Sequence, residues 1–297
     1  EVLATEMLEA LGVNTSKSFS LVETGEALQR HDEPSPTRAS VLVRLSHSHI
    51  RIGTFQRLSF RKDVEGIRRL VAHSVKHYVT EAARDDETEQ VAAFYEAVSR
   101  RVARMGAQWM AAGFVHGVLN TDNINITGES FDYGPWRWAP TYDPDFTAAY
   151  FDHGGLYSLG RQPEALMWNL ARLGGCLLPL AGEEALQDAL SAFEPELHGE
   201  FARMVFWRLG LAPRDPEADA AVVRALYDFL VKSRSPLDDV FFDWRGGEAS
   251  ATRAPATAHY ASEAFAAVRA TWRDHAPSPG ANLNHPYFAG RDRPCSM

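Results

Sequence analysis

The segment HGVLNTDNINITGESFDYGP, residues 116–135, crowds oxygen-bearing side chains between two apolar stretches. An Asp-Asn pair is followed, nine residues after its asparagine, by Asp-Tyr-Gly. The intervening INITGES has the pattern of a short hairpin, so Asn123 and Asp132 stand at its two ends. Magnesium in nucleotide sites is held by one or two such oxygen ligands together with substrate phosphates. Asn123 and Asp132 are therefore candidate metal ligands, and Asp122 is a candidate proton acceptor.

Composition narrows the class of protein. The chain has 297 residues, of which 45% are hydrophobic, and a chain of this size can bury about 75% of its unfolded surface. Its net charge of -9 disfavours binding to nucleic-acid phosphates. No segment has the ~20 consecutive apolar residues of a membrane helix, and two distant cysteines exclude a disulfide framework. We expect a cytoplasmic protein without nucleic-acid or membrane partners.

Hydrophobic periodicity predicts an α+β fold that becomes almost entirely helical after about residue 60. A short helix comes first, and two strands joined by a loop follow at SFSLVETGEAL (18–28) and SVLVRLS (40–46). Trp109, Trp168 and Trp207 lie on helical apolar stripes, which predicts that they belong to the core. Cys176 is expected to be a small buried residue. The later predicted helices cover residues 63–78, 88–112, 162–180, 183–193, 196–209, 216–233 and 260–273.

The order of these features matches the C-lobe of a protein kinase. In kinases a long helix precedes the catalytic loop, whose asparagine and the following Asp-aromatic-Gly hold the metal ions. The kinase proton acceptor lies five residues before that asparagine, where this chain has Val118, which cannot accept a proton. We expect one kinase-like domain over residues 1–297. An incomplete N-lobe would span residues 1–60, and a helical C-lobe with catalytic loop 116–135 would span 61–297.

Four other interpretations stay open from the residues alone. The polar residues of the loop could simply form turns, because Asn and Asp bond their own backbone. A metal-dependent hydrolase would use His116 and His153, although neither belongs to an HxxxH or HxH pair on a helix near the loop. An ordinary ATP-dependent phosphotransferase would use the same metal ligands. An inactive pseudokinase would act only as a binding module.

Four strings carry a resemblance to a known family: LATEMLEALGV (3–13), VLVRLSHSHIRIGTF (41–55), GFVHGVLNTDNINITGESFDYGPW (113–136) and YDPDFTAAYFDHGGLYSLGRQPEALMWNLARL (142–173). Over residues 1 to about 179 the chain resembles the selenoprotein O family. That family consists of kinase-like protein adenylyltransferases, which bind ATP in a flipped orientation and transfer AMP to protein hydroxyls. The resemblance implies transfer of AMP to Ser, Thr or Tyr of protein substrates with release of pyrophosphate, using magnesium or manganese.

The resemblance also implies roles for single residues. Asp122 matches the proton acceptor of the family, and Asn123 and Asp132 match its metal ligands, with Asp132 also near the nucleotide. Arg44 and Arg51 match two arginines that contact ATP phosphates. Arginine suits this role because its planar fork matches phosphate oxygens.

Glu1 matches a helix glutamate that pairs with a nucleotide-binding lysine in the family. That lysine and its glycine-rich loop lie upstream in relatives, and this sequence starts at the glutamate without a methionine. We therefore expect a fragment of a longer protein that binds ATP poorly by itself. Cys295, two residues before Met297, is a weaker candidate for a redox role.

The remaining polar residues near the motif are expected to be structural. His116 should hold the catalytic loop, and Asp152 and His153 should fix the later loop. The segment RKDVEGIRR, residues 61–69, reads as a solvated helix face rather than a phosphate-binding surface.

Overall fold

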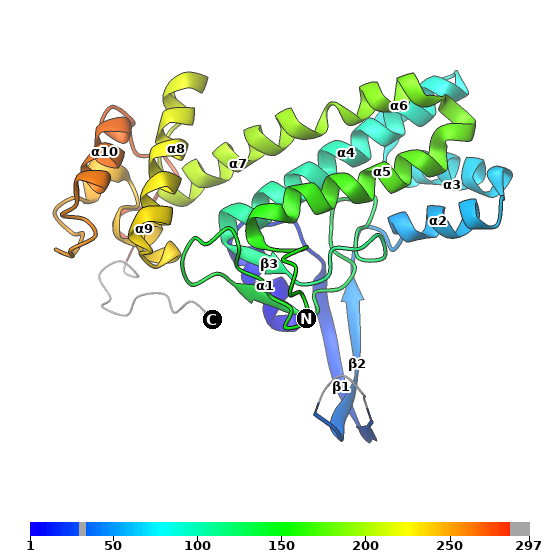
Figure 1. The fold of residues 1–297 in the computed structure, drawn as a ribbon, viewed down its shortest axis with the longest axis horizontal. Coiled ribbons are helices and arrows are strands. Elements are labelled where there is room, and N and C mark those ends of the chain that lie inside the picture. The colour runs from blue at the N-terminus through cyan, green and yellow to red at the C-terminus, as the bar shows by residue number, and fades with distance from the viewer. Residues whose placement is uncertain (30–33, 286–297) are drawn as a thin grey trace.

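A computed structural model describes residues 1–29 and 34–285. Its centre is α4 (Glu87–Ala112), which packs against α5 (Gln162–Ala181), α6 (Glu183–Leu190) and α7 (Phe193–Leu209) (Figure 1). The Asp86 carboxylate caps α4 by accepting a hydrogen bond from the Glu89 N–H. Gly113 ends the helix in the left-handed conformation, at φ 69°. The predicted long helix is confirmed, and its end leads directly into the 116–135 loop.

Three further helices lie around this bundle on the N-terminal side. The first, α1 (Val2–Ala10), agrees with the sequence prediction, as does α3 (Val64–His77), which Asp63 caps. Between the strands and α3 the chain forms α2 (Ile52–Phe60), which the sequence did not predict. Only Ile52 and Phe55 of α2 are buried, so its nine residues carry too little periodic signal.

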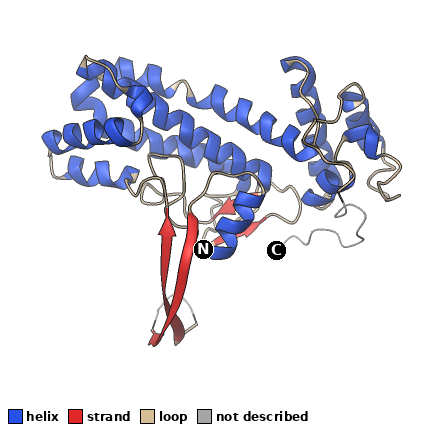
Figure 2. Ribbon diagram, turned by 180° about the vertical axis from the view of Figure 1, so that it is seen from behind, coloured by secondary structure: helices blue, strands red, loops and turns tan. Residues whose placement is uncertain are grey.

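The two predicted strands form an antiparallel hairpin of β1 (Lys17–Leu28) and β2 (Thr37–Leu45), with Leu21 opposite Leu42. The hairpin projects away from the helical body (Figures 1 and 2). Several of its apolar side chains are exposed, and the Phe19 side chain is 73% exposed. The end of the hairpin near Ser18 and Arg44, which are paired in the register, approaches the loop of interest.

The C-terminal part contains α8 (Pro216–Ser233), α9 (Leu237–Asp243) and α10 (Glu263–Trp272), which surround a second apolar cluster. Phe229, Phe265 and Trp272 are fully buried there. The helix α9 was not predicted, and α10 begins three residues later than expected. Short 3₁₀ turns occur at Thr80–Ala82, Leu159–Arg161 and Gly247–Ser250.

The structure tests the predicted core residues individually. Trp109 is buried, and so is Cys176, as the sequence predicts. Trp168 and Trp207 are 53% and 43% exposed, so placing them in the core was wrong. Apolar stripes on α5 and α7 are wider than the face that each helix buries, and periodicity alone cannot tell where the stripe ends. Cys295 lies outside the described residues.

Two three-residue strands hold the ends of the catalytic loop together. They are β3 (Phe114–His116) and β4 (Trp136–Trp138), and His116 pairs with Trp136. In the described part of the chain, no helix is long and apolar enough to cross a membrane. The mixed and mainly helical fold therefore agrees with the α+β prediction.

Candidate functional site

The loop between β3 and β4 folds back on itself as a hairpin, as its sequence predicts. Ile124 bridges to Ser130, and the Asn125 N–H donates to the Glu129 carbonyl at 3.0 Å. The Phe131 N–H donates to the Asn123 carbonyl at 2.9 Å. The fold of the loop therefore brings Asn123 beside the residue that precedes Asp132.

His116 fixes the far end of this hairpin. Its Nδ1 accepts a hydrogen bond from the Val118 N–H at 3.1 Å, so the ring proton is on Nε2. Nε2 then donates to the Asp132 carbonyl at 2.7 Å, beside the Ser130 hydroxyl at 2.9 Å. Burial lowers the pKa of His116 to about 4, despite its contact with the Asp132 carbonyl. A neutral, fully hydrogen-bonded histidine is structural, as the sequence predicts.

Asp122 is exposed just before this hairpin begins, against the first turn of α2. The Asp122 N–H donates to the Asn120 side chain at 3.0 Å, and the Gly53 N–H donates to the Thr121 carbonyl at 2.9 Å. A Cβ on Gly53 would lie 3.0 Å from Asp122 Cγ and closer still to Oδ1. Because Gly53 has no side chain, the carboxylate can rest beside the start of α2.

Asn123 is oriented by Val118, the residue at the position where kinases have their proton acceptor. Its side-chain N–H donates to the Val118 carbonyl at 2.8 Å. Val118 therefore takes part through its backbone rather than its side chain. The bond uses the amide nitrogen of Asn123 and leaves its oxygen as the atom suited to a hard cation.

Glu1, Arg44 and Asp132 come together from distant parts of the sequence. Glu1 Oε1 accepts a hydrogen bond from the Tyr133 N–H at 2.6 Å and lies 3.5 Å from an Arg44 guanidinium nitrogen. The pKa of Glu1 is raised to about 7, first by burial and then by the neighbouring Asp132 carboxyl, although the Tyr133 N–H and Arg44 both act to lower it. Glu1 Oε2 is buried and has no hydrogen bond of good geometry within the described residues. A buried acceptor of this kind fits a cationic partner such as the expected lysine.

Both candidate phosphate-binding arginines contact Phe131, the residue before Asp132. The Arg44 guanidinium donates to the Phe131 carbonyl and, at 2.8 Å, to the Ser16 hydroxyl. The Arg51 guanidinium lies over the Phe131 ring, 4.2 Å from its centroid, and donates to the Asp122 carbonyl at 3.3 Å. Arg44 is only 16% exposed, so it is not a strand residue reaching for solvent.

A cavity of about 330 Å³ opens at this point. Sequence reasoning missed several of its contributors, including Phe131 and His49, whose rings meet edge to face with centroids 6.0 Å apart. It also missed Glu129, which is fully buried and holds the Ser46 hydroxyl at 2.6 Å and the His47 ring. The one available signal was the SHSH run beside Arg51. The cavity is lined by Leu42, Arg44, Ser46, His49, Asn125 and Phe131.

The donor set fits magnesium better than zinc. Among the described residues, no group of three or more His, Cys, Asp and Glu could hold a metal ion. His116 is committed to the loop, so the hydrolase interpretation has no ligand set in the described part of the chain. Asn123 and Asp132 provide two oxygen donors, which is the usual protein contribution to magnesium bound with phosphates.

Comparisons with known proteins show the family of this chain. The family model described as protein adenylyltransferase SelO matches residues 1–276. The chain belongs to this family. The resemblance therefore does not end near Pro179, as the sequence strings indicated, but continues through α8 and α10. The later helices have less distinctive sequences, which explains the underestimate.

Three relatives illustrate the extent of the SelO match. Proteins named protein nucleotidyltransferase YdiU from Synechocystis and Trichormus variabilis are 46% identical over 252 residues and 44% identical over 244 residues, respectively. A protein of the same name from Cereibacter sphaeroides is 39% identical over 241 residues. These matches cover 82%, 82% and 79% of this chain, and 53%, 50% and 49% of the relatives. The chain thus spans about half the length of the curated relatives it matches.

Proposed function

We propose that this protein transfers AMP from ATP to hydroxyl groups of Ser, Thr or Tyr in protein substrates. The observation that carries the proposal is the convergence of Glu1, Arg44, Arg51, Asp122 and Asp132 around a single loop. Family membership and the names of the relatives support the same chemistry. We assign residues 1–60 to part of a kinase-like N-lobe and residues 61–297 to a helical C-lobe. We place the protein in the cytoplasm.

In the proposed reaction the acceptor hydroxyl oxygen attacks the α-phosphorus of ATP. The new bond joins that oxygen to phosphorus, the bond to the β-phosphate bridging oxygen breaks, and pyrophosphate leaves. Asp122 takes the hydroxyl proton, for which its exposed position at the start of the loop hairpin is suited. Magnesium or manganese, bound by Asn123 and Asp132, would supply charge neutralisation of the phosphates.

The two arginines have separate tasks in this proposal. Arg44 is held by backbone and by Glu1, so it presents a fixed charge to the cavity. Arg51 is held more loosely, over an aromatic ring at the start of α2. Fixed charges aimed at a leaving group are usually the largest catalytic term, because they need no reorganisation during the reaction.

Phosphotransfer is the second candidate, because kinases use the same metal ligands. Val118 counts against it, because its side chain occupies the place of the kinase base and its carbonyl orients Asn123. An inactive binding module is a third candidate. The presence of both candidate metal ligands, Asn123 and Asp132, counts against this interpretation.

Labelled ATP separates these candidates. The protein at its natural full length is incubated with magnesium and ATP labelled at either the α- or the γ-phosphate. Asp132→Ala is the test variant, and Asp188→Ala, on the exposed face of α6, is the matched control. We expect protein-bound label only from the α-position, lost in Asp132→Ala and retained in the control.

The other outcomes would favour one of the two other candidate functions. Label from the γ-position would establish a kinase and refute adenylyl transfer. No label from either position, together with a thermal shift on adding ATP and magnesium, would favour the binding module.

A further inference from the structure

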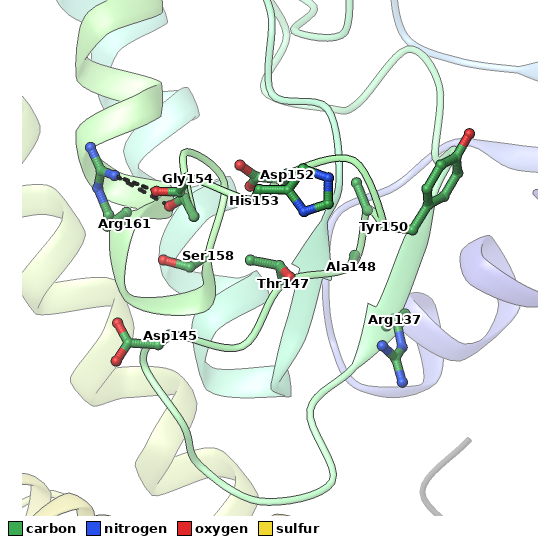
Figure 3. Close-up of a pocket in the computed structure, with 12 residues that line it drawn as sticks. Arg137, Asp145, Thr147, Ala148, Tyr150, Asp152, His153, Gly154, Ser158 and Arg161 are labelled. Carbon is green, nitrogen blue, oxygen red and sulfur yellow. Dashed lines mark hydrogen bonds between the residues drawn. The ribbon is translucent and has the colours of Figure 1, made fainter. Parts of the chain in front are cut away.

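A second cavity, of about 630 Å³, lies in the segment that follows the catalytic loop (Figure 3). It is larger than the cavity at Arg44 and shares no lining residue with it. One wall comes from β4, and the rest comes from the chain between β4 and α5. Its polar lining includes Arg137, Asp145, Thr147, His153, Ser158 and Arg161.

This cavity is joined directly to the catalytic loop. Arg137, in β4, pairs with Val115 in β3, and the Gly117 N–H donates to the Pro135 carbonyl at 2.8 Å. A Cβ on Gly117 would lie 3.2 Å from the Cβ of Ala149, which lines the cavity. The wall of the cavity therefore touches the chain five residues before Asp122.

The cavity is preformed rather than a gap in a loose loop. The Asp152 carboxylate accepts hydrogen bonds from the Leu156 and Tyr157 N–H groups, both at 2.8 Å. Arg161 donates to the Gly154 and Gly155 carbonyls, at 3.4 Å each. Asp152 therefore fixes the loop, as its sequence context predicts, and its charge is already engaged.

The charged residues of the lining are two arginines, Arg137 and Arg161, and two aspartates, Asp145 and Asp152. Arg161 is paired with Glu164 at 3.0 Å. Arg137 has no ion-pair partner within residues 1–29 and 34–285, and its guanidinium rests over the Phe146 ring, 4.9 Å from the centroid. Figure 3 places Asp145 and Arg137 on opposite sides of the cavity. An arginine without an ion-pair partner thus stands at one end of the cavity, and at that end it favours an acidic side chain of an occupant.

The rim has the composition of a protein-binding surface. Tyr150, which lines the cavity, is 73% exposed, and Phe151 and Leu156, in the same segment of the chain, are about half exposed. Aromatic residues and arginine are enriched where proteins meet other proteins. A small anion would need no such rim, whereas a peptide segment would cover it.

We propose that this cavity receives the segment of the protein substrate that carries the acceptor hydroxyl, with an acidic side chain of that segment paired to Arg137. The inference rests on the proposed adenylyl transfer. Asp132 and Arg137 are five residues apart, so their Cα atoms are separated by at most about 18 Å. An extended peptide of about five residues spans that distance. The acidic side chain therefore lies within about five positions of the acceptor.

Synthetic peptides test this directly. One sequence with a single serine is made with Glu, Gln or Lys at each of the five positions on either side. The kcat/KM for α-label incorporation is compared for the unaltered protein, Arg137→Gln and Arg137→Glu. Arg172→Gln is the matched control, because that arginine lies over Trp168 on α5 and outside the cavity.

We expect the best Glu peptide to exceed its Gln counterpart about tenfold, which is the effect of one favourable charge pair of about 1.4 kcal/mol. Arg137→Gln should abolish the preference, and Arg137→Glu should reverse it in favour of Lys. The control should retain it, and the KM for ATP should not change in any variant.

Binding of the fluorescently labelled Glu peptide in the absence of ATP is measured by fluorescence anisotropy. This measurement tests the cavity independently of catalysis. Unweakened binding by Arg137→Glu would overturn the proposal, and so would a Glu preference that survives that change. Label incorporation without any charge preference would overturn it too, while leaving adenylyl transfer intact. Peptide binding that depends on Arg137 but gives no α-label would instead refute the proposed function.

Discussion

Replacing Gly53 with alanine should damage activity without damaging the fold. The added Cβ would lie 3.0 Å from Asp122 Cγ, whereas carbon atoms in contact prefer about 3.5–4.0 Å, so the carboxyl group must retreat by about 0.5–1 Å. A misplacement of about 1 Å at a reacting group can cost about 100-fold. We therefore expect kcat for adenylyl transfer to fall by about 10- to 100-fold in Gly53→Ala.

Stability should respond in the opposite direction. Gly53 is in the first turn of α2, where alanine is favoured over glycine by up to about 1 kcal/mol. The atom displaced is the end of a side chain, which can swing away at little cost. The melting temperature should therefore stay level or rise by about 2–4 °C.

Gly175→Ala is the matched control, because Gly175 is a helical glycine in α5 with open space at its Cβ position. Steady-state kinetics with α-labelled ATP and thermal unfolding are measured on both variants. If Gly53→Ala kept kcat within about threefold of the control, the position of the Asp122 carboxylate would not matter. Asp122 could then not be the base in this geometry. A large loss of melting temperature in Gly53→Ala alone would instead show that the clash is not absorbed by the side chain.

Three other changes have outcomes set by the structure. The pKa of His116 is about 4 in the folded protein against an ordinary value of 6.5, so the unfolded chain binds its proton first as the pH falls. The free energy of unfolding is therefore highest above about pH 6.5 with respect to this group, and it should fall by up to about 3 kcal/mol as the pH falls towards 4. Urea titrations should show a flatter pH profile in His116→Gln, and an unchanged slope would contradict this. Trp109→Ala should cost about 3–5 kcal/mol of unfolding free energy, because Trp109 is fully buried, whereas exposed Trp168→Ala should cost about 1 kcal/mol or less. Equal losses of unfolding free energy in denaturant titrations of the two variants would show that the exposed fraction of the side chain does not set this cost. Phe131→Leu removes the ring beneath Arg51, a contact of about 0.5–1 kcal/mol, and should raise the KM for ATP about two- to fivefold. Phe131→Tyr should restore it, and a tyrosine variant as impaired as leucine would exclude the ring contact as the cause.

The sequence was sufficient for much of the fold, and the reason is periodicity. The helices α4, α5, α7 and α8 run for 17 to 26 residues, and each repeats its apolar positions several times. Several repeats of the apolar spacing are enough to identify the segment as a helix from the sequence. The shorter helices α2 and α9 span nine and seven residues, offer fewer repeats, and were missed.

The candidate site was predicted unevenly. Asp122, Asn123 and Asp132 lie in one short motif, so their proximity follows from local chain geometry. Phe131, Glu129 and His49 carry no motif of their own, and their roles come from contacts with residues 80 or more positions away.

The sequence by itself determined the helical periodicity, the loop hairpin and the family. These features depend on neighbouring residues and on the order of motifs, and both are present in the sequence itself. Only the tertiary structure decided that Arg44 and Arg51 meet at Phe131, that Glu1 shares the surroundings of Asp132, and that Trp168 is outside the core. Such contacts arise when segments far apart in the chain, such as α1, the base of the hairpin and the 116–135 loop, come together. Packing depends on the three-dimensional fit of segments far apart in sequence, which no local pattern records.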